Sequence, residues 1–492
     1  MLRKLGTISG LTLVSRIMGL VRDVVLAATL GAGPLADAFM LAFRLPNHFR
    51  AIFAEGAFNA AFLPIWAATE ARGEDNNRLG SEVLGWLMLA NLIVLSFALG
   101  ATGWLLYLLA PGLAADDPLR PLALTLTRIT FPYLLCMSLV AFLSALLNSR
   151  DRFAATAGAS ILLNLFMVAA LLSAHLFPTA AHAAAWGVML SGIAQVALLL
   201  TEAWRVGIPL HLPALGLSPE TRTFFRRLGP AILTSGALQV AIFADTVIAT
   251  FLPEGSLSHL YYADRLYQLP VGLIGVALGT ILLPDIGRRA GKGDEDGMRA
   301  VVDRALMVCL VVGVPLTVLM ALLGDWGMQI LFMRGAFDLA AANAAGAILA
   351  AYALGLIPAL AVRSLVASFH GRGDTRTPLR ILAGSTVLNI ALKFALTPTM
   401  GAMGLALATS VGMVVYVGVL YLTALRRGYA RGLPLRKVAL MAGAGLLLAG
   451  AILLGKPWLA ASVGILASSA VFLMLAAITA LLTFKVLRPS RG

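Results

Sequence analysis

The sequence has 492 residues, of which 60% are hydrophobic and 12% are charged. Soluble globular domains carry about 25% charged residues, so this composition excludes a soluble globular protein and indicates an all-α polytopic membrane protein. The formal net charge of +14 follows the membrane topology described below, so it does not indicate a nucleic-acid partner.

The predicted elements are apolar runs of about 20 residues or more, the length that crosses a bilayer. Several of the runs exceed this length, so we expect tilting or breaks, notably at Pro46, Pro270 and Pro358. The first run follows MLRK and superficially resembles a signal peptide, but arginines interrupt it and it continues well beyond an ordinary h-region, which predicts a retained helix. The fourteen expected spans are residues 6–31, 36–66, 82–110, 121–148, 155–177, 183–203, 228–252, 258–286, 302–323, 339–369, 379–398, 402–424, 436–455 and 459–484.

The basic residues between these spans predict the orientation of the chain. With the N-terminus inside, the inside loops and termini carry 25 Lys and Arg residues, whereas the outside loops carry only Arg120, Arg334 and Lys456. Cytoplasmic loops of membrane proteins are enriched in basic residues. We therefore expect both termini to be cytoplasmic.

The first two spans contain four arginines, Arg16, Arg22, Arg44 and Arg50. A guanidinium keeps its charge at any accessible pH, and burying one in hydrocarbon costs at least about 2.5–3.5 kcal/mol. Four such cations predict a polar cavity that binds an anion. The planar fork of arginine binds phosphate oxygens in pairs, so a diphosphate is the expected kind of ligand.

Two other interpretations of these arginines stay open. Long basic side chains can extend to the membrane surface, or the arginines can pair with Asp23, Asp37 and Glu55 of the same region. Arg44 fits these interpretations as well as it fits a functional one. Arg16 lies about ten residues into its helix, or about 15 Å from the end, which is deep for a side chain that extends to the surface.

The second half contains further polar groups within apolar spans. Arg265 is expected to complete the anion site across a central cavity; the alternative is a local or interhelical pair with Asp264. A separate set of polar side chains on spans 7, 11 and 12 could converge on a monovalent cation, although helix–helix hydrogen bonding explains the same residues. Lys393 complicates the cation site because its own ammonium could occupy it. This candidate ion-coupling set is Asp245, Asn389, Lys393 and Thr409.

The two halves of the sequence repeat one another. Asp23 is followed by the Leu-Pro pairs at 45–46 and 63–64, and Asp245 is followed by the same pairs at 269–270 and 283–284. Each repeat holds six spans, an even number, so the two copies share one orientation in the membrane. This predicts two parallel six-helix bundles with a transport site between them, plus two additional helices. The expected domains are residues 1–205, 220–427 and 433–492.

Three motifs closely resemble a known family. They are SRIMGLVRDVV, ADAFMLAFRLPNHFRAIFAEGAFNAAFLP and YYADRLYQLPVGLIGVALGTILLP, and they resemble the bacterial lipid II flippase (MurJ/MviN) family of the multidrug/oligosaccharidyl-lipid/polysaccharide exporter superfamily. The resemblance covers the whole chain. It implies a multi-pass transporter of the inner membrane that moves undecaprenyl-diphosphate-linked disaccharide-pentapeptide to the outer leaflet by alternating access, for peptidoglycan biosynthesis.

The resemblance also implies roles for single residues. The cavity arginines of the family fall on Arg16, Arg22, Arg50 and Arg265, and Asp37 occupies a motif position. Helices 13 and 14 would form a groove for the lipid tail. Some members bind sodium through a carboxylate where this chain has a lysine at position 393, so we expect the tethered lysine charge to replace the ion. Where members carry a second basic residue after Arg50, this chain has an alanine.

Three other functions stay open. A cation-coupled drug exporter of the same superfamily is the first rival, although a cavity for cationic drugs should contain excess carboxylates. A flippase for another polyprenyl-diphosphate glycan and a membrane scaffold without transport are the others. The sequence has no P-loop, metal-ligand spacing or nucleophile motif, so we expect neither an enzyme nor a cofactor other than sodium. The expected partners are lipid II and membrane lipid, without nucleic acid, for a chain that functions as a monomer.

Overall fold

The computed structural model describes residues 2–52, 57–72, 76–114, 116–208 and 212–487. The secondary structure of these residues is helical, without strands. The chain divides into two compact units, the first containing Met1–Ser258 with Arg334–Phe337, and the second containing His259–Met333 with Asp338–Gly492. The expected all-α fold is therefore confirmed, while the expected domain boundaries near residues 205 and 220 stay a prediction.

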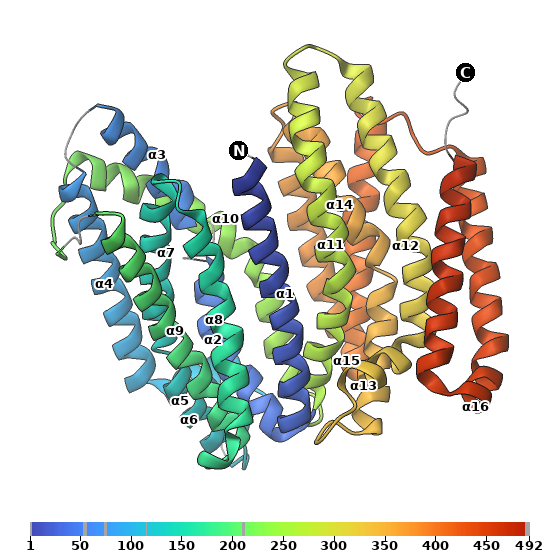
Figure 1. The fold of residues 1–492 in the computed structure, drawn as a ribbon, viewed down its shortest axis with the longest axis horizontal. Coiled ribbons are helices and arrows are strands. Elements are labelled where there is room, and N and C mark those ends of the chain that lie inside the picture. Colours follow the sequence, from blue (N-terminus) through green and yellow to red (C-terminus); the bar gives the residue numbers. More distant parts are fainter. Residues whose placement is uncertain (1, 53–56, 73–75, 115, 209–211, 488–492) are drawn as a thin grey trace. The chain divides into compact units, whose positions relative to one another are not determined.

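The first unit contains the helices drawn in blue to green in Figure 1. Its largest contacts join α1 to α8, α8 to α9 and α7 to α9. The helices are α1 (Leu2–Leu30), α2 (Pro34–Ile52), α3 (Phe58–Ala71), α4 (Asn77–Gly100), α5 (Thr102–Leu109), α6 (Arg120–Thr130), α7 (Tyr133–Ser149), α8 (Phe153–Leu172), α9 (Ala180–Arg205) and α10 (Pro219–Ala249), with a short 3-10 helix at Ala174–Leu176.

An aromatic cluster forms the core of the first unit. Phe58 and Phe62 of α3 lie between α7 and α10, with the Phe62 and Phe142 ring centroids 5.8 Å apart and the Phe58 and Phe224 centroids 5.7 Å apart. All four side chains are buried, and aromatic side chains supply a large apolar area for packing. The cluster therefore fixes α10 to the first unit, although α10 follows the expected boundary between domains.

A carboxylate fixes the start of α10 in the same way. Glu82 of α4 accepts hydrogen bonds from the backbone nitrogen of Ser218 (2.8 Å) and from Oγ1 of Thr221 (2.7 Å). Ser218 is also the N-cap residue of α10, where amide groups lack helical partners. The first turn of α10 is thereby attached to α4.

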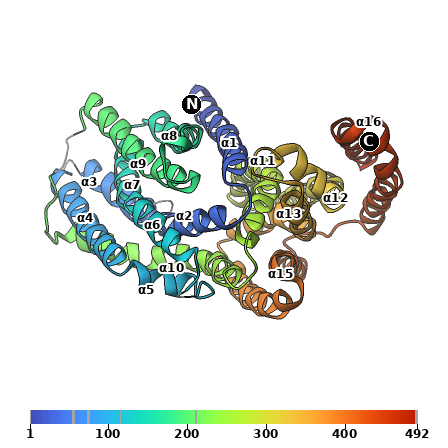
Figure 2. The same ribbon diagram turned by 90° about the horizontal axis from the view of Figure 1, so that it is seen from below.

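The second unit contains the remaining helices, drawn from green to red in Figure 1. Helix α12 packs against α13, α14 and α16. The helices are α11 (Ser256–Ala290), which begins at the border of the units, α12 (Glu295–Phe332), α13 (Leu339–Ala353), α14 (Leu356–His370), α15 (Arg376–Arg426) and α16 (Leu435–Leu487). Figure 2 shows α15 and α16 as hairpins of two helical segments each.

Local backbone conformations explain these interruptions. The α15 hairpin turns at Gly401 (φ 57°) and the α16 hairpin turns at Gly464 (φ 79°), conformations that favour glycine. Helices α13 and α14 meet at a bend of 41°, which corresponds to the expected break near Pro358. The breaks expected at Pro46 and Pro270 are wrong, because α2 and α11 continue through both prolines; neighbouring groups in a membrane protein can satisfy the freed backbone atoms.

The length and apolar character of the helices fit a membrane. Eight helices in the described part of the chain are long and apolar enough to cross a bilayer, and the bent pair α13–α14 provides a ninth. The polytopic membrane character predicted from composition is therefore supported. The number of fourteen spans stays a prediction.

Candidate functional site

Arg22 is the most deeply buried of the candidate arginines whose side chains the structure describes, with 8% of its surface exposed. Its Nε and Nη2 donate to Oδ1 of Asp23 (3.0 and 2.7 Å), and its Nη1 donates to Oδ1 of Asn164 on α8 (3.0 Å). Asn164 also donates to the carbonyl of Ser15 (3.1 Å). Arg22 thus pairs with an acid, as one of the alternatives predicted, and it also links α1 to α8.

Arg16 differs from Arg22 although both belong to α1. The Arg16 side chain is exposed, and no acidic side chain among the described residues forms an ion pair with it. Its guanidinium can therefore bind an anion without first breaking an ion pair. Arg50 belongs to α2, but its side chain lies outside the described residues.

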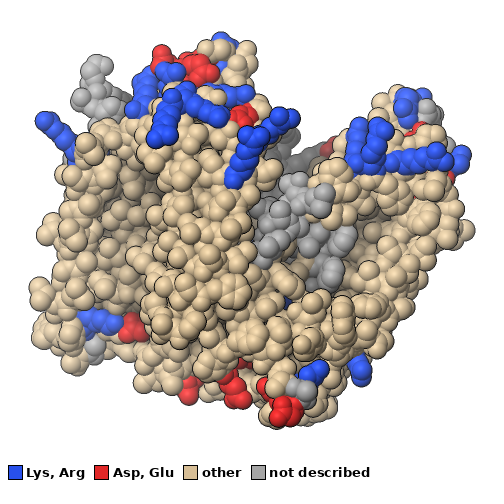
Figure 3. All heavy atoms as spheres, turned by 180° about the vertical axis from the view of Figure 1, so that it is seen from behind, with Lys and Arg blue, Asp and Glu red and all other residues tan. Residues whose placement is uncertain are grey.

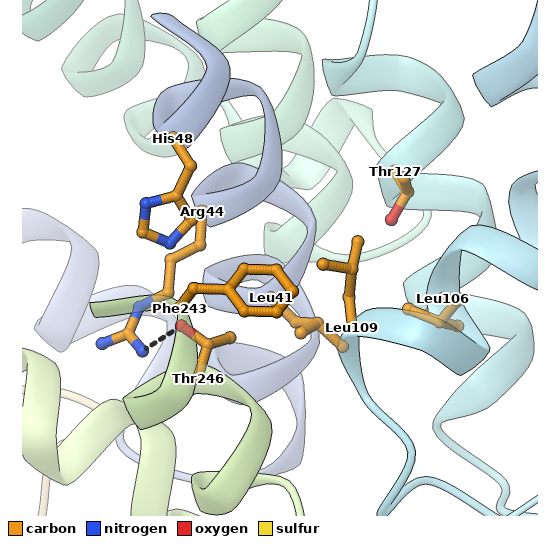
Figure 4. Close-up of a pocket in the computed structure, with 8 residues that line it drawn as sticks. All are labelled: Leu41, Arg44, His48, Leu106, Leu109, Thr127, Phe243 and Thr246. Carbon is orange, nitrogen blue, oxygen red and sulfur yellow. Dashed lines mark hydrogen bonds between the residues drawn. The ribbon is translucent and has the colours of Figure 1, made fainter. Parts of the chain in front are cut away.

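Arg44 connects α2 to α10 within the first unit. Its Nη1 donates to Oγ1 of Thr246 (3.1 Å), and His48, one turn later, pairs its Nδ1 with Oε1 of Gln239 (3.2 Å). Figure 4 shows both side chains of α2 extending toward α10, beside Phe243. The adjoining cavity measures about 10 Å³, about the space of one water molecule, so this region is a packed helix contact rather than a substrate pocket.

Asp37 binds backbone amides. Its Oδ2 accepts from the nitrogen of Gly255 (2.6 Å) and its Oδ1 accepts from the nitrogen of Ser258 (2.8 Å). These amides lie at the N-terminus of α11, where the helix dipole favours a negative charge. Asp37 of α2 therefore holds the start of α11.

Arg265 belongs to α11 in the second unit. Its guanidinium carbon lies 4.5 Å from the ring centroid of Tyr261, one turn earlier, in a cation–π contact. The neighbouring Asp264 accepts a hydrogen bond from Nε2 of Gln268 (3.3 Å). The ring of Tyr261 thus helps to orient the guanidinium of Arg265, and both residues belong to α11.

The candidate ion-coupling residues of α15 stay a prediction, and Lys393 places a cationic group among them. Lys393 is fully buried, and its ammonium is a donor where a cation needs oxygen ligands. Asn389 packs against α15's second segment, because a Cβ atom on Gly412 would lie 2.8 Å from Asn389 Nδ2. Thr409 donates to the carbonyl of Leu405 (3.0 Å). Asp245, the fourth member, is a half-buried residue of α10 in the other unit.

The second unit also contains an apolar groove of about 510 Å³. Leucine and isoleucine side chains of α11 and α12 form most of its surface, and the second segment of α16 contributes Ser469 and Leu473. The groove can hold an apolar chain and offers few polar partners. Sequence analysis placed a groove on residues 433–492; the observed groove includes this segment but is built mainly on α11 and α12.

The sequence contains features that point to two of the residues in these contacts. Asn164 ends the segment SLVAFLSALLNSRDRFAATAGASILLN, which parallels the segment that ends at Asn389 in the second half, and it is a partner of Arg22. His48 was not recognised, although it follows Arg44 by four residues on α2 and so lies on the same helix face.

Comparison with known proteins identifies the family. The family model of the lipid II flippase MurJ matches residues 26–477. The chain belongs to the MurJ family. The resemblance inferred from the three sequence motifs is therefore confirmed.

Individual MurJ relatives match over most of their length. A probable lipid II flippase MurJ of Rhizobium meliloti is 35% identical, covering 94% of this chain and 88% of the relative. A probable lipid II flippase MurJ of Rhizobium tropici is 37% identical, covering 87% and 82%. The lipid II flippase MurJ of Burkholderia cenocepacia is 33% identical, covering 91% and 89%.

Solved structures show the same fold. A lipid II flippase MurJ in an inward closed conformation matches with a TM-score of 0.81 at 22% identity, covering 97% of this chain and 98% of that one. A multidrug resistance MATE family transporter in an inward-facing conformation matches with a TM-score of 0.70 at 15% identity, covering 84% and 94%. The MurJ fold and the MATE fold are thus related.

Proposed function

We propose that this chain is a flippase that moves lipid II from the inner to the outer leaflet of the cytoplasmic membrane. The match of the MurJ family model over residues 26–477 carries this proposal. The chain is accordingly a transporter rather than an enzyme, and a multi-pass protein of the inner membrane that serves peptidoglycan synthesis. Permanent cations within apolar helices supply the physical reason that a diphosphate lipid is a suitable substrate.

The proposed architecture has fourteen membrane spans, arranged as two parallel six-helix bundles followed by the α16 hairpin. Both termini are proposed to be cytoplasmic, from the 25 inside and three outside basic residues of the sequence. Figure 3 shows Lys and Arg side chains gathered in groups, and broad areas of the surface with few charged side chains. The proposed orientation rests on the positions of the basic residues in the sequence.

The diphosphate is proposed to bind the arginines. Arg16 supports this role most directly, because its exposed guanidinium is not bound to an acid of the described residues. Arg22 would act with Asp23 and Asn164, which fix its orientation and leave its charge partly neutralised. Arg50 and Arg265 join this set on sequence grounds, and Asp37 would act by holding α11 rather than by touching the anion.

The lipid tail is proposed to remain in apolar surroundings while the headgroup crosses. Moving a charged headgroup through hydrocarbon is costly, whereas charge-assisted hydrogen bonds in a wet cavity replace its hydration. The apolar groove formed by α11, α12 and the second segment of α16 suits a prenyl chain. The substrate would thus be bound at two sites. The arginines would bind the diphosphate, and the apolar side chains of the groove would bind the prenyl tail.

The return of the empty transporter is proposed to depend on membrane potential rather than on sodium. The ammonium of Lys393 is buried in α15, where other members of the family would bind a cation. A membrane potential is worth about 2.3 kcal/mol per charge per 100 mV, and an empty cationic cavity provides charge on which it can act. In this proposal the fixed charge of Lys393 replaces the sodium ion, so alternating access needs no bound ion.

The rival functions receive less support. The likeness to a MATE transporter concerns the fold alone at 15% identity, and the excess of arginine over acids in the first two spans suits an anion better than a cationic drug. Another polyprenyl-diphosphate glycan would suit the same arginines and is the second candidate. We propose that the chain works as a monomer, without nucleic acid, and that lipid II is its substrate.

A complementation experiment tests this function. The chain is expressed in a strain depleted of its own lipid II flippase, as wild type and with Arg16, Arg22, Arg50 or Arg265 changed to alanine. Wild type should restore growth, and each alanine variant should fail at normal protein levels. Arg152→Ala, at an exposed loop position, is the matched control and should grow.

Two results would contradict the proposal. Failure of the wild-type chain to restore growth, although it reaches the membrane, would remove the assignment of lipid II as substrate. Normal growth of all four alanine variants would instead favour a membrane scaffold, since a scaffold does not need cavity arginines.

A further inference from the structure

Lys456 and Asp325 form a three-centred contact between α16 and α12. The Lys456 ammonium donates to both carboxylate oxygens of Asp325 (2.9 and 2.8 Å) and to the backbone carbonyl of Leu322 (2.9 Å). It also lies 5.2 Å from the ring centroid of Trp326. The ammonium therefore has three acceptor atoms on α12, two of them on the same carboxylate.

The contact lies at an irregularity in α12. Leu323 has a non-helical conformation (φ −122°, ψ 17°), which interrupts the regular helix at this point. Lys456 donates to the carbonyl of the preceding residue, Leu322. The lysine thus stabilises the bend in α12 and holds α16 to it at the same point.

Apolar side chains also attach α16 to α12, in two clusters of buried residues. Leu319, Leu323 and Trp326 of α12 pack against Leu448, Ile452 and Phe472 of α16. The other faces of the hairpin are exposed; for example, Leu447 is 78% exposed and Leu454 is 84% exposed. In a bilayer such faces contact lipid, which is as apolar as leucine and provides little hydrophobic drive for helix association. The polar contact of Lys456 with Asp325 therefore acts together with this apolar packing in fixing the position of the hairpin.

The same bend forms part of the wall of the apolar groove. Leu319, Leu323 and Gly324 of α12 form one side, and Ser469 and Leu473 of α16 contribute another. Leu323 belongs both to the groove and to the contact with α16. A shift of α16 along or away from α12 would therefore change the width of the groove.

We propose that Lys456 and Asp325 are positioning residues that hold α16 on α12 and thereby determine how well the groove accepts a long prenyl chain. The inference rests on the proposed function, because it takes the groove as the site of the lipid tail. The pair itself touches neither the diphosphate nor the chain. Its removal should lower the preference for long-chain substrate rather than abolish transport.

Distance measurements test the attachment without using transport. Spin labels are placed on Met333 at the end of α12 and on Leu466 of α16, after Cys136 and Cys309 are replaced by alanine. Lys456→Met and Asp325→Asn should each broaden the distance distribution, and the exchanged pair Lys456→Asp with Asp325→Lys should narrow it again. Unchanged distributions in both single variants would overturn the proposal.

Transport with two substrates tests the consequence for the tail. Flipping of lipid-linked diphosphate glycan with an undecaprenyl chain is compared with flipping of the same headgroup on a farnesyl chain, in vesicles containing full-length protein. Wild type should prefer the long chain, and Lys456→Met should lower this preference by about fivefold, the factor expected for a pair of modest strength. The exchanged pair should restore most of the chain-length preference. The restoration should be incomplete, because the exchanged lysine no longer donates to the Leu322 carbonyl.

The control and the contrary outcomes separate this inference from the proposed function. Glu202→Gln removes the peripheral pair with Arg152 (4.0 Å) and should leave the chain-length preference unchanged. Equal preference in wild type and Lys456→Met would overturn the inference while the proposed function stands. If wild type flips neither substrate, the proposed function fails, and the distance measurements alone decide whether the pair positions α16.

Discussion

Arg22 and Asn164 lie 142 positions apart in the sequence and are joined by a 3.0 Å hydrogen bond between α1 and α8. Gly19 of α1 lies beside this contact, since a Cβ atom there would be at an ordinary van der Waals distance of 3.8 Å from the Asn164 carboxamide. The arginine is also bound to its neighbour Asp23. A cation within an apolar helix is thus held in one orientation by an acid and an amide.

Asn164→Ala tests the importance of this orientation. Loss of the amide leaves a buried donor of Arg22 without its partner, which costs about 1–3 kcal/mol. We expect a lower unfolding temperature and slower lipid II flipping, measured in detergent and in vesicles respectively. Ser160→Ala, at an exposed hydroxyl on the same helix, should change both far less; equal effects of the two variants would refute a special role for Asn164.

Asp37→Ala should destabilise the start of α11. Two backbone amides lose their acceptor, and removal of such a cap costs about 0.5–2 kcal/mol. Asp37→Asn keeps an acceptor oxygen and should be milder in both thermal unfolding and transport. Asp338→Ala, which removes the comparable cap of α13, is the matched control for stability. If Asp37→Asn were as harmful as Asp37→Ala, the charge rather than the cap would be important.

Removal of sodium should leave transport by wild type unchanged. In the proposed function the buried ammonium of Lys393 replaces a bound cation, so replacing external and internal sodium with choline should not slow lipid II flipping in vesicles. Collapse of the membrane potential should slow it. A strict requirement for sodium in the wild-type chain would contradict the proposed role of Lys393.

The loop between α14 and α15 should contribute to acid sensitivity. Hydrogen bonds from the side chain and backbone of Thr377, together with Arg427, hold the pKa of Asp374 below its usual value of 3.8. A lowered pKa means that the carboxylate stabilises the fold above pH 3.8 and that this contribution is lost as the pH falls through the lower, folded-state pKa.

Asp374→Asn should therefore flatten the fall in unfolding temperature as the pH drops below about 4, because the carboxylate with the lowered pKa is no longer there to be protonated. The control is Asp116→Asn, at an exposed position where the described residues provide no hydrogen bond of this kind to the carboxylate. If the unfolding temperature of the Asp374→Asn variant fell as steeply with pH as that of wild type, other carboxylates would dominate the acid sensitivity of the fold.

The sequence predicted the chemistry of single segments better than their contacts. The apolar runs and the interrupting arginines identified the membrane class, because burial of a guanidinium is costly wherever it occurs. The contact of Arg22 with Asn164 depends on how α1 packs against α8, and no local rule specifies it. The same limit applies to Asp37, whose partners on Gly255 and Ser258 lie more than 200 positions away.

The prolines illustrate a second limit. Pro46 and Pro270 suggested interruptions, yet α2 and α11 continue through them. The actual irregularity of α12 lies at Leu323, an ordinary apolar residue in sequence, where Lys456 from α16 provides a hydrogen bond. Backbone breaks in a membrane protein thus depend on the partners that neighbouring helices supply.

Transport by purified protein in vesicles is the most direct measurement of the proposed function. Lipid II is placed in one leaflet, and its appearance in the other is followed for wild type, Arg16→Ala and protein-free vesicles. Wild type should flip lipid II, and Arg16→Ala should be about 10–100-fold slower, since hydrogen bonds to a charged group are worth about 1.5–3 kcal/mol. Movement by wild type no faster than in protein-free vesicles, or full activity of Arg16→Ala, would contradict a flippase that binds its substrate through this arginine.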